Sequence, residues 1–511
     1  EESALEPCSA LPPRAVIQLN ANCVRHALKR AGLLVNVAQP SSRSGPILVL
    51  WARHSGDKLW KELPRHGITN HYPGSWALGR KDGLWKHLSA QQRRLGDSTY
   101  DFVPRTFVLP ADRGALERAA AAGLLRGGGA LIVKPLNSSR GRGVKMVLST
   151  AELPSDPAAK LLVQEYIERP LLLQGRKFDL RLYVAVTSFD PLRAYVFEQG
   201  LARFANAPYS AAADAGARVG KELDRYAHLT NYSICKKEAG YEPNVDAAAD
   251  GEGSKWSLAA LWRTLGAAGH PVEAVRSSIA EVLTRTLIAA QPHITHKYSQ
   301  YFRERGKCVE LFGFDVLLDA DLSAWLIEVN VSPDLSSSSP LDRQIKHTLA
   351  ADLLHLVGVR PPVGASAADD AAAARPAPFL TRTTTGKEAS ELAATPLPKL
   401  GPAELDVLVE SEEEEWRASH TDFRPLYPRD AATTRRCERL FATRRHADAL
   451  VASHYQRGDD KRAELLRKEL ARRAAAHKLA SRAPAPRSRT PSALARPAAV
   501  AAAAAAGPRS Q

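Results

Sequence analysis

Short apolar runs alternate with amphipathic stretches through residues 46–358, and this alternation predicts a mixture of strands and helices. The apolar runs are rich in β-branched residues and bounded by turn residues, as strands are. Strands are predicted at residues 46–54, 106–110, 130–135, 144–149, 161–167, 178–188 and 193–205. Helices are predicted where apolar residues recur at helical spacing, within 68–88, 117–125, 256–269, 274–294 and 340–358. Because the two kinds of element alternate without regular βαβ units, the expected class is α/β, in a mixed α+β arrangement.

Composition divides the chain into a patterned part and a part with few strand or helix patterns. Beyond residue 359 Ala, Pro, Ser and Arg dominate, and such a composition buries too little apolar surface to order itself. One or two basic helices within 435–478 are the exception. We therefore expect an N-terminal lead-in (1–45), an N-terminal domain (46–110), a central lobe (111–190), a C-terminal lobe (191–360), a linker (361–405), a basic helical extension (406–478) and a disordered tail (479–511).

The clearest local prediction is a β-hairpin over residues 308–330, with its turn at Asp321 and Leu322. Alternation with a period of two places one set of side chains on each face. One face carries Trp325, Ile327 and Val329, and the other carries Leu326, Glu328 and Asn330. The turn also places Asp315 opposite Glu328, a pairing that a slip of one residue would destroy.

Asp315, Glu328 and Asn330 then bring two carboxylates and an amide oxygen together on otherwise apolar strands. Hard oxygen ligands of this kind suit Mg²⁺, which is usually held by one or two protein carboxylates together with nucleotide phosphates. A hydrogen-bonded polar edge of the sheet is the alternative. We favour the metal site, because such a set is costly to bury without a cation.

A basic, glycine-containing turn follows the strand at 130–135 and could bind phosphate. Lys134 lies at the strand end, and Arg140, Gly141 and Gly143 follow in a turn whose backbone can approach an anion closely. The turn matches neither the GxxxxGK[ST] phosphate loop nor the GxGxxG dinucleotide fingerprint. A flexible basic hairpin is the alternative, and the turn becomes a strong nucleotide candidate only together with the metal set.

Lys177, Asp179 and Arg181 alternate along one strand and therefore share a face. Arg203 lies on the strand that follows. These basic groups could neutralise phosphates or hold a carboxylate substrate, and ion pairing with Asp179 across the strands is the alternative. Farther along the chain, a polar loop typical of binding sites contains Thr230, Asn231, Tyr232 and Ser233.

Composition also constrains the partner and the compartment. The formal charge of +15 indicates an acidic partner, such as nucleic acid, an anionic membrane or an acidic protein tail, unless the basic tail alone accounts for it. No apolar run reaches the ~20 residues that span a bilayer. The five cysteines are scattered without a CxxC pair, which favours a reducing compartment. Since the chain begins with Glu1 and its single methionine is Met146, we expect a fragment or a processed form.

Several motifs between residues 70 and 358 occur together in the order and spacing of one known family. They are VKPLNSSRGRGV, KFDLRLYV, GLARFA, HLTNYSI, KWSL, FGFD and WLIEVNVSP. In these motifs the chain resembles the tubulin tyrosine ligase-like family over more than half of its length. SSRGRGV, RPLLL, DPLRAYVFEQGLARFA and PLDRQIK are most similar to its tubulin polyglutamylase branch, as is the later segment EEEEWRASHTDFRPLYP.

The resemblance implies an ATP-grasp-like ligase core, in which two lobes clamp ATP beneath a strand–loop lid. Carried over position by position, ATP would be held by Lys134, Arg140, Gly141, Gln164, Glu165, Tyr166, Ile167, Lys177, Asp179, Thr230 and Asn231. Mg²⁺ would be bound by Asp315, Glu328 and Asn330. The amino-acid substrate would be held by Arg203, Tyr232, Ser233, Lys255 and Lys346. Glu165 departs from the family pattern, where a basic residue is common, but backbone contacts to adenine would tolerate it.

The same resemblance implies ATP-dependent addition of glutamate to glutamate side chains of tubulin tails through an acyl phosphate. Lys134, Arg181, Arg203 and Glu328 would be the catalytic residues. The implied partners are tubulin in microtubules and free L-glutamate, with neither nucleic acid nor membrane. We expect a monomer in the cytoplasm and on the cytoskeleton, including the cilium or basal body.

Two further functions stay open. The first is a glycine ligase of the same family, although Arg203 and Lys346 favour an anionic side chain on the incoming amino acid. The second is a non-catalytic microtubule-binding scaffold, although that would predict the loss of a metal or phosphate residue. The basic helices within 435–478 could bind microtubules or only be solvated. A nucleic-acid binder is disfavoured, because the basic tail has few aromatic residues.

Overall fold

The computed structural model describes most of the chain between residues 14 and 482. The described residues are 14–17, 21–36, 47–54, 60–61, 63, 67–125, 130–137, 141–154, 156, 158–209, 225–230, 241–242, 244, 246, 250–337, 339–359, 383–385, 387–388, 391–392 and 395–482. Residues up to Leu466 form one compact unit, and those from Arg467 onward form a second, of which the end of one helix is described.

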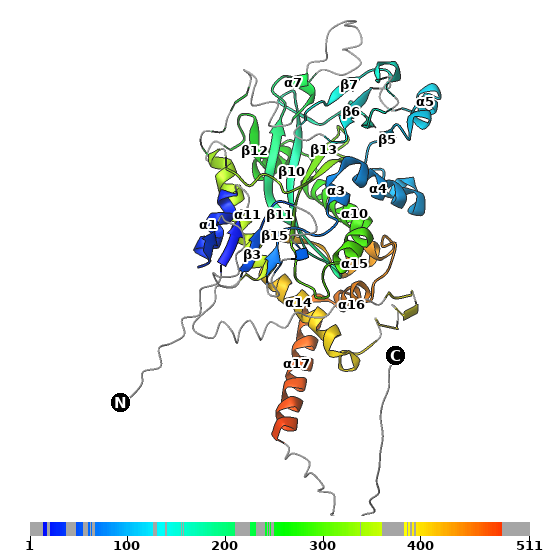
Figure 1. The fold of residues 1–511 in the computed structure, drawn as a ribbon. Coiled ribbons are helices and arrows are strands. Elements are labelled where there is room, and N and C mark those ends of the chain that lie inside the picture. The colour runs from blue at the N-terminus through cyan, green and yellow to red at the C-terminus, as the bar shows by residue number, and fades with distance from the viewer. Residues whose placement is uncertain are drawn as a thin grey trace, which may run out of the picture. The chain divides into compact units, whose positions relative to one another are not determined.

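An antiparallel sheet of seven strands forms the centre of the first unit (Figure 1). Its strands are β9 (Leu172–Leu173), β10 (Arg176–Phe189), β11 (Leu192–Phe204), β12 (Lys255–Ser257), β13 (Glu310–Leu318), β14 (Ala324–Val331) and β15 (Phe423–Tyr427). The order is β12-β11-β10-β13-β14, with β15 paired to β11 and β9 to β10. All residues of β13 are buried, which explains why its sequence is a nearly continuous apolar run.

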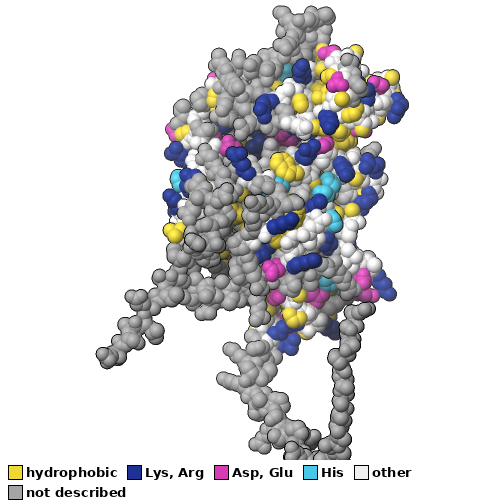
Figure 2. Space-filling model, in the orientation of Figure 1, with side chains coloured by type: hydrophobic (Ala, Val, Ile, Leu, Met, Phe, Trp, Pro, Cys, Tyr) yellow, Lys and Arg dark blue, Asp and Glu magenta, His cyan; other side chains and the backbone are white. Residues whose placement is uncertain are grey.

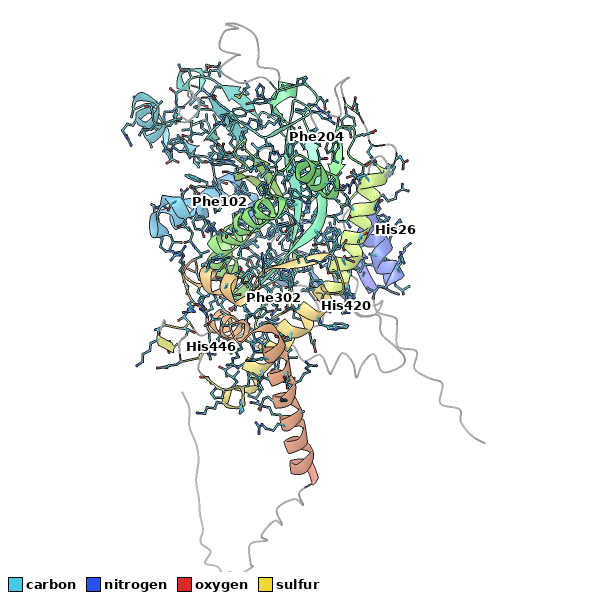
Figure 3. The ribbon with its side chains drawn as sticks, turned by 180° about the vertical axis from the view of Figure 1, so that it is seen from behind. His26, Phe102, Phe204, Phe302, His420 and His446 are labelled. Atoms are coloured by element: carbon cyan, nitrogen blue, oxygen red, sulfur yellow. The ribbon has the colours of Figure 1, made fainter. Side chains whose placement is uncertain are left out.

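Helices cover both faces of this sheet (Figure 1). On one face lie α3 (Trp76–Gly79), α4 (Lys81–Leu95), α9 (Leu258–Ala267) and α10 (Val272–Ser299), and on the other lie α1 (Asn22–Arg30) and α11 (Pro340–Val357). Successive residues of β10 alternate between two apolar cores, Leu182 and Val184 toward α10 and Tyr183 and Ala185 toward α11. Phe102, Phe204 and Phe302, labelled in Figure 3, belong to the first of these cores.

A smaller antiparallel sheet stands beside the central one and has the order β5-β8-β6-β7. Its strands are β5 (Thr106–Leu109), β6 (Leu131–Pro135), β7 (Lys145–Val147) and β8 (Leu161–Glu165). Helix α5 (Arg113–Ala121) packs its Leu116 and Ala119 against Phe107, Val133 and Val163. The predicted strand pair around the basic turn is confirmed, since β6 and β7 pair from Leu131–Val147 to Val133–Lys145.

A third, parallel sheet has the order β2-β1-β3-β4. Its strands are β1 (Arg14–Ile17), β2 (Leu34–Asn36), β3 (Ile47–Trp51) and β4 (Ile68–Thr69). The expected boundaries differ here. Part of the predicted lead-in of residues 1–45 forms two strands and α1 of this sheet, and the strand expected to close the N-terminal domain, β5, belongs to the smaller sheet instead.

Residues 401–466 also belong to the first compact unit, which the composition did not predict. Besides β15 they contain α14 (Pro402–Ala418), α15 (Ala431–Glu438), α16 (His446–Tyr455) and the start of α17 (Asp459–Arg482). β15 pairs with β11, and Leu426 and Tyr427 enter the central core. Helix α14 is acidic rather than basic, and its Glu414 forms a buried ion pair with Arg193 at 3.2 Å. The expected basic helical extension of residues 406–478 thus begins with an acidic helix, and its strand β15 pairs with the central sheet.

The remaining described elements are short. They are α7 (Arg225–His228) and the 3-10 helices η1 (Asp97–Thr99), η3 (Thr150–Glu152) and η4 (Leu397–Lys399). Among the described helices, none is both long and apolar enough to cross a membrane. Cys23, Cys308 and Cys437 are buried free thiols.

Candidate functional site

A cleft lies between the smaller sheet and one end of the central sheet. Strands β6 and β8 form one wall, strands β10, β13 and β14 form the other, and the residues after α7 close one end. The predicted site residues that line it are Lys134, Gly141, Gln164, Glu165, Tyr166, Ile167, Lys177, Asp179, Thr230, Asp315 and Glu328. Residues from distant parts of the sequence therefore converge on one cavity.

Two buried lysines face this cleft with uncharged hydrogen-bond partners. Lys134 Nζ donates to Gln164 Oε1 at 2.8 Å, and Lys177 Nζ donates to Tyr166 Oη at 2.9 Å. Burial lowers the pKa of Lys134 to about 8 and the pKa of Lys177 to about 7. A buried ammonium group beside neutral partners is unfavourable, so an anionic ligand would stabilise both lysines.

A cluster of arginines and carboxylates crosses strands β10, β11 and β13. Asp179 lies opposite Arg203, and Arg181 lies opposite Asp315. Arg203 donates to Asp179 Oδ1 at 2.7 Å and to Asp315 Oδ2 at 2.8 Å, and Arg181 Nε donates to Asp315 Oδ1 at 2.6 Å. Thr230 Oγ1 also donates to Asp179 at 2.8 Å. Ion pairing across the strands, which the sequence left as the alternative for these arginines, is thus present.

The predicted pairing of the hairpin strands is confirmed at the polar residues, where Asp315 lies opposite Glu328 and Gly313 opposite Asn330. The predicted faces are wrong beyond that point. Val316 pairs with Leu326, so a bulge leaves Ile327 without an opposite residue and shifts the alternation. Leu326 therefore enters the apolar core together with Val329, on the face opposite to Glu328 and Asn330.

The hairpin residues Asp315, Glu328 and Asn330 offer the oxygen ligands that a magnesium site needs. Burial and the adjacent charge of Asp315 raise the pKa of Glu328. Burial opposes ionisation of Asp315 as well, but Arg181 and Arg203 outweigh it and lower the Asp315 pKa to about 2. Asn330 Nδ2 donates to Glu328 Oε1 at 3.3 Å, so the third predicted ligand lies beside the second. A divalent cation fits these residues, because it would offset the repulsion between the two carboxylates.

The predicted amino-acid-binding lysines lie next to the arginine cluster and share a buried counter-ion. Lys255 lies opposite Arg203 in the pairing of β11 with β12. Lys255 Nζ donates to Asp342 Oδ2 at 3.0 Å, while Lys346 Nζ lies 3.4 Å from Asp342 Oδ1 and donates to Ser336 O at 2.8 Å. Neither lysine nor Arg203 lines the cleft itself. Lys255 and Lys346 thus form, with Arg203, a second cationic group outside the lining of the cleft.

Comparison with known protein families identifies the fold. The profile of the tubulin-tyrosine ligase family matches residues 59–367, which include every predicted site residue. This match covers more than half of the chain. The chain belongs to the tubulin-tyrosine ligase family. The resemblance noted from the sequence motifs is therefore confirmed, and so is the mixed α/β, ATP-grasp-like fold that it implied.

Relatives with known names agree with this assignment. The chain is 42% identical over 319 residues to tubulin monoglutamylase TTLL4 of Homo sapiens, a match of 62% of this chain and 26% of that protein. It is 35% identical over 431 residues to tubulin polyglutamylase ttll-4 of Caenorhabditis elegans, covering 81% of this chain and 67% of the relative. Tubulin polyglutamylase TTLL5 of Homo sapiens is 36% identical over 344 residues. The chain spans about a quarter of the length of the human proteins that it matches.

Some predicted residues lie outside the described part of the chain, and some lining residues were not predicted. Arg140, Asn231, Tyr232 and Ser233 lie outside the described residues. The cleft residues that the sequence missed include Lys81, Arg142, His228, Leu317 and Ile327. His228 Nδ1 lies 2.9 Å from Tyr166 Oη, beside the bond to Lys177. No pattern in the sequence connects Lys81 with Lys134. The pair of basic residues Arg80 and Lys81 at the start of α4 is the one feature of the sequence that could have pointed to Lys81.

Proposed function

We propose that this protein is an ATP-dependent carboxylate–amine ligase that adds glutamate to glutamate side chains of tubulin. The observation that carries the proposal is one cleft in which two buried lysines face two adjacent carboxylates. Lys134 and Lys177 supply the cationic side, and Asp315 and Glu328 supply the anionic side. The names of the relatives, tubulin monoglutamylase and tubulin polyglutamylase, support both the amino acid and the acceptor.

The polyphosphate of ATP would lie between Lys134 and Lys177, where it replaces neutral partners with anionic ones. Residues 164–167, at the end of β8 and just after it, would contact adenine. Asp179 and Thr230 would contact the ribose. The cleft holds about 100 Å³ as it stands, below the ~300 Å³ at which small-molecule pockets usually begin. A nucleotide therefore fits only when the side chains or strands that line the cleft move apart.

Asp315, Glu328 and Asn330 would hold Mg²⁺, which supplies charge neutralisation on the transferring phosphoryl group. The chain's own residues perform the remaining work. Lys134 and Lys177 offset charge on the phosphate oxygens, a form of electrostatic stabilisation that needs no rearrangement during the reaction. Arg181 and Arg203 fix the position of the Asp315 carboxylate through their ion pairs.

The reaction then proceeds in two displacements. An oxygen of the acceptor side-chain carboxylate attacks the γ-phosphorus of ATP, the bond to the β-phosphate oxygen breaks, and ADP leaves. The neutral α-amine of free glutamate attacks the resulting acyl phosphate, phosphate leaves with the bonding electron pair, and the nitrogen loses one proton to solvent and keeps the other as the amide N–H. The product is an amide between two glutamates. Holding both substrates in place can supply several kcal/mol of the barrier reduction, ~7 kcal/mol or more in favourable cases.

Free L-glutamate would be bound by Arg203, Lys255 and Lys346, together with Tyr232 and Ser233, and the buried Asp342 would keep the two lysines in place. Lysine and arginine side chains are spread over the visible face of the protein (Figure 2), as expected for an enzyme whose acceptor is acidic. The substrate implies a location on microtubules of the cytoskeleton, and the cilium or basal body is the narrower proposal.

Incubation with ATP, Mg²⁺, labelled glutamate or labelled glycine, and microtubules tests this function. We expect glutamate to be incorporated and glycine to be excluded. Incorporation of glycine alone would replace the proposal with a glycine ligase. If the folded protein binds microtubules but incorporates neither amino acid, the non-catalytic scaffold is the correct description.

A further inference from the structure

A chain of hydrogen bonds outside the cleft connects the interior of the protein with the end of β14. Glu310, the first residue of β13, and His71 are almost completely buried, whereas Ser332, directly after β14, is exposed. Glu310 Oε1 lies 2.6 Å from His71 Nδ1, and His71 Nε2 lies 3.0 Å from Ser332 Oγ. None of the three residues lines the cleft, and the proposed binding of ATP, Mg²⁺ and glutamate gives them no role.

The partners of His71 determine the direction of each hydrogen bond. An ionised carboxylate can only accept, so His71 Nδ1 donates to Glu310. The second oxygen of Glu310 accepts from the backbone N–H of Tyr72 at 2.8 Å. Asn70 Nδ2, which can only donate, lies 3.1 Å from His71 Nε2. Nε2 is therefore an acceptor, and the hydroxyl of Ser332 donates to it.

The segment that contains His71 is tied to two sheets. The side-chain amide of Asn70 exchanges two hydrogen bonds with the backbone of Ala52, directly after β3, at 2.8 and 3.1 Å. The backbone of Thr69 exchanges two more, each of 2.9 Å, with the segment that leads into β13. His71 is therefore held between the parallel sheet and the central sheet, and it can serve as a fixed anchor for Ser332.

The anchored turn is strained and adjoins one of the predicted metal ligands. Ser332 has a φ of 59°, in the left-handed region that residues other than glycine seldom adopt. Such strain persists where surrounding contacts impose it. The turn brings Pro333 close to Gly313, where a Cβ would lie 3.1 Å from Pro333 Cβ. Asn330 Nδ2 donates to the carbonyl oxygen of Gly313 at 3.2 Å, so Oδ1 is the atom that can bind a cation.

We propose that Glu310, His71 and Ser332 are positioning residues for the cation. Their hydrogen bonds hold the left-handed turn at Ser332, and the turn keeps Asn330, two residues earlier, oriented toward the metal. The inference rests on the proposed function, in which Asn330 is a ligand of Mg²⁺. Hydrogen-bonded groups behind a metal ligand typically contribute about 10–100-fold to metal affinity. Since this chain acts through the backbone, we expect the lower end of that range.

The test measures, by calorimetry, how much Mg²⁺ raises the affinity for an ATP analogue that cannot be hydrolysed. Ser332→Ala should reduce this gain about tenfold, because alanine loses the bond to His71 and disfavours a positive φ. Ser332→Gly should recover most of the gain, since glycine adopts a positive φ without steric cost. Ser299→Ala is the matched control. It removes a hydroxyl that donates to His296 O within α10 at 2.9 Å, and it should change the gain less than about twofold.

A second pair of variants tests whether the three residues act as one chain. Glu310→Gln should reduce the gain about as much as Ser332→Ala, because a neutral amide holds His71 less firmly than a carboxylate does. The combined variant should lose no more than either single variant, since both changes break the same chain. The affinity for the analogue without Mg²⁺ should be equal in all variants, which shows that they are folded.

Each alternative result has a distinct meaning. An unchanged gain in Ser332→Ala, or additive losses in the combined variant, would overturn the inference. Failure of Ser332→Gly to recover the gain would overturn it as well, because the hydroxyl itself would then be required. An unmodified protein without any Mg²⁺ gain would overturn both the inference and the metal site. If the gain depends on Ser332 but microtubules receive no glutamate, the ligase proposal fails while the positioning role stands.

Discussion

Raising the pH should weaken nucleotide binding, because the two lysines of the cleft carry pKa values close to neutrality. Burial lowers the pKa of Lys177 to about 7 and that of Lys134 to about 8. Lysine is ordinarily protonated to about pH 10.4, so the free protein holds these groups partly uncharged under conditions where exposed lysines are charged. A bound polyphosphate favours the charged form, so binding must be accompanied by proton uptake.

The size of the effect follows from the two pKa values. Between pH 7.5 and 8.5 the protonated fraction falls about eightfold for a pKa of about 7 and about threefold for a pKa of about 8. If nucleotide requires both ammonium groups, its affinity should fall about 25-fold over this interval, which is about 2 kcal/mol. At pH 8 the same values predict uptake of about 1.4 protons per nucleotide bound.

Calorimetric titration of an ATP analogue that cannot be hydrolysed, in buffers of different ionisation enthalpy, measures both the affinity and the proton uptake. The interval above pH 7.5 is chosen because phosphate groups with a pKa near ~6 are already ionised there. Lys177→Arg keeps a charge at all these pH values and should remove most of the dependence. A dissociation constant that stays constant from pH 7.5 to 8.5 in the unmodified protein, without proton uptake, would refute the reasoning.

Three further outcomes follow from the described contacts. Glu328→Gln should abolish glutamate incorporation, and in nucleotide titrations it should remove the gain in affinity that Mg²⁺ provides, whereas a variant that keeps this gain would exclude the metal site. Glu414→Ala should lower the free energy of unfolding by about 3 kcal/mol in denaturant titrations, because it removes the nearer counter-ion of the buried Arg193 and leaves only Glu410, at 3.7 Å. Arg424→Ala, at an exposed ion pair, should cost less than about 1 kcal/mol and serves as its control. A chain ending at Val359 should be insoluble or unfolded by circular dichroism, because it lacks β15 and the partners of the β11 edge.

The polar side chains on the strands of the candidate site could be predicted because side chains alternate along a strand with a period of two. The opposition of Asp315 and Glu328 expected from a turn at Asp321 and Leu322 is present, but next to the turn Leu318 pairs with Ala324, one residue out of that register, and the bulge at Ile327 restores it. The bulge at Ile327 could not be predicted, since nothing in an apolar run indicates which residue lacks a partner. The face of Leu326 was therefore assigned wrongly, whereas Asp315, Glu328 and Asn330 lie beyond the bulge as counted from the turn, where the predicted register holds.

Long-range packing explains the other differences. The composition after residue 359 indicated disorder because it is poor in apolar residues on average. The strand β15 needs only a few apolar residues, because its backbone pairs with the exposed edge of β11. Asp342 illustrates the same limit. Its spacing to Lys346 along α11 is visible in the sequence, but its bond to Lys255 joins residues that only the fold brings together.

The charges of Lys134, Lys177 and Glu328 explain why metal and nucleotide should each raise the affinity of the protein for the other. Arg181 and Arg203 already neutralise Asp179 and Asp315 through their ion pairs. Nucleotide alone would satisfy Lys134 and Lys177 but bring its phosphates toward Glu328, whose carboxylate lines the same cleft. A cation alone would neutralise Glu328 but add positive charge beside two lysines whose pKa values burial has lowered. Each ligand therefore removes the repulsion that opposes the other, and we expect positive coupling between them of the order of ~1–3 kcal/mol.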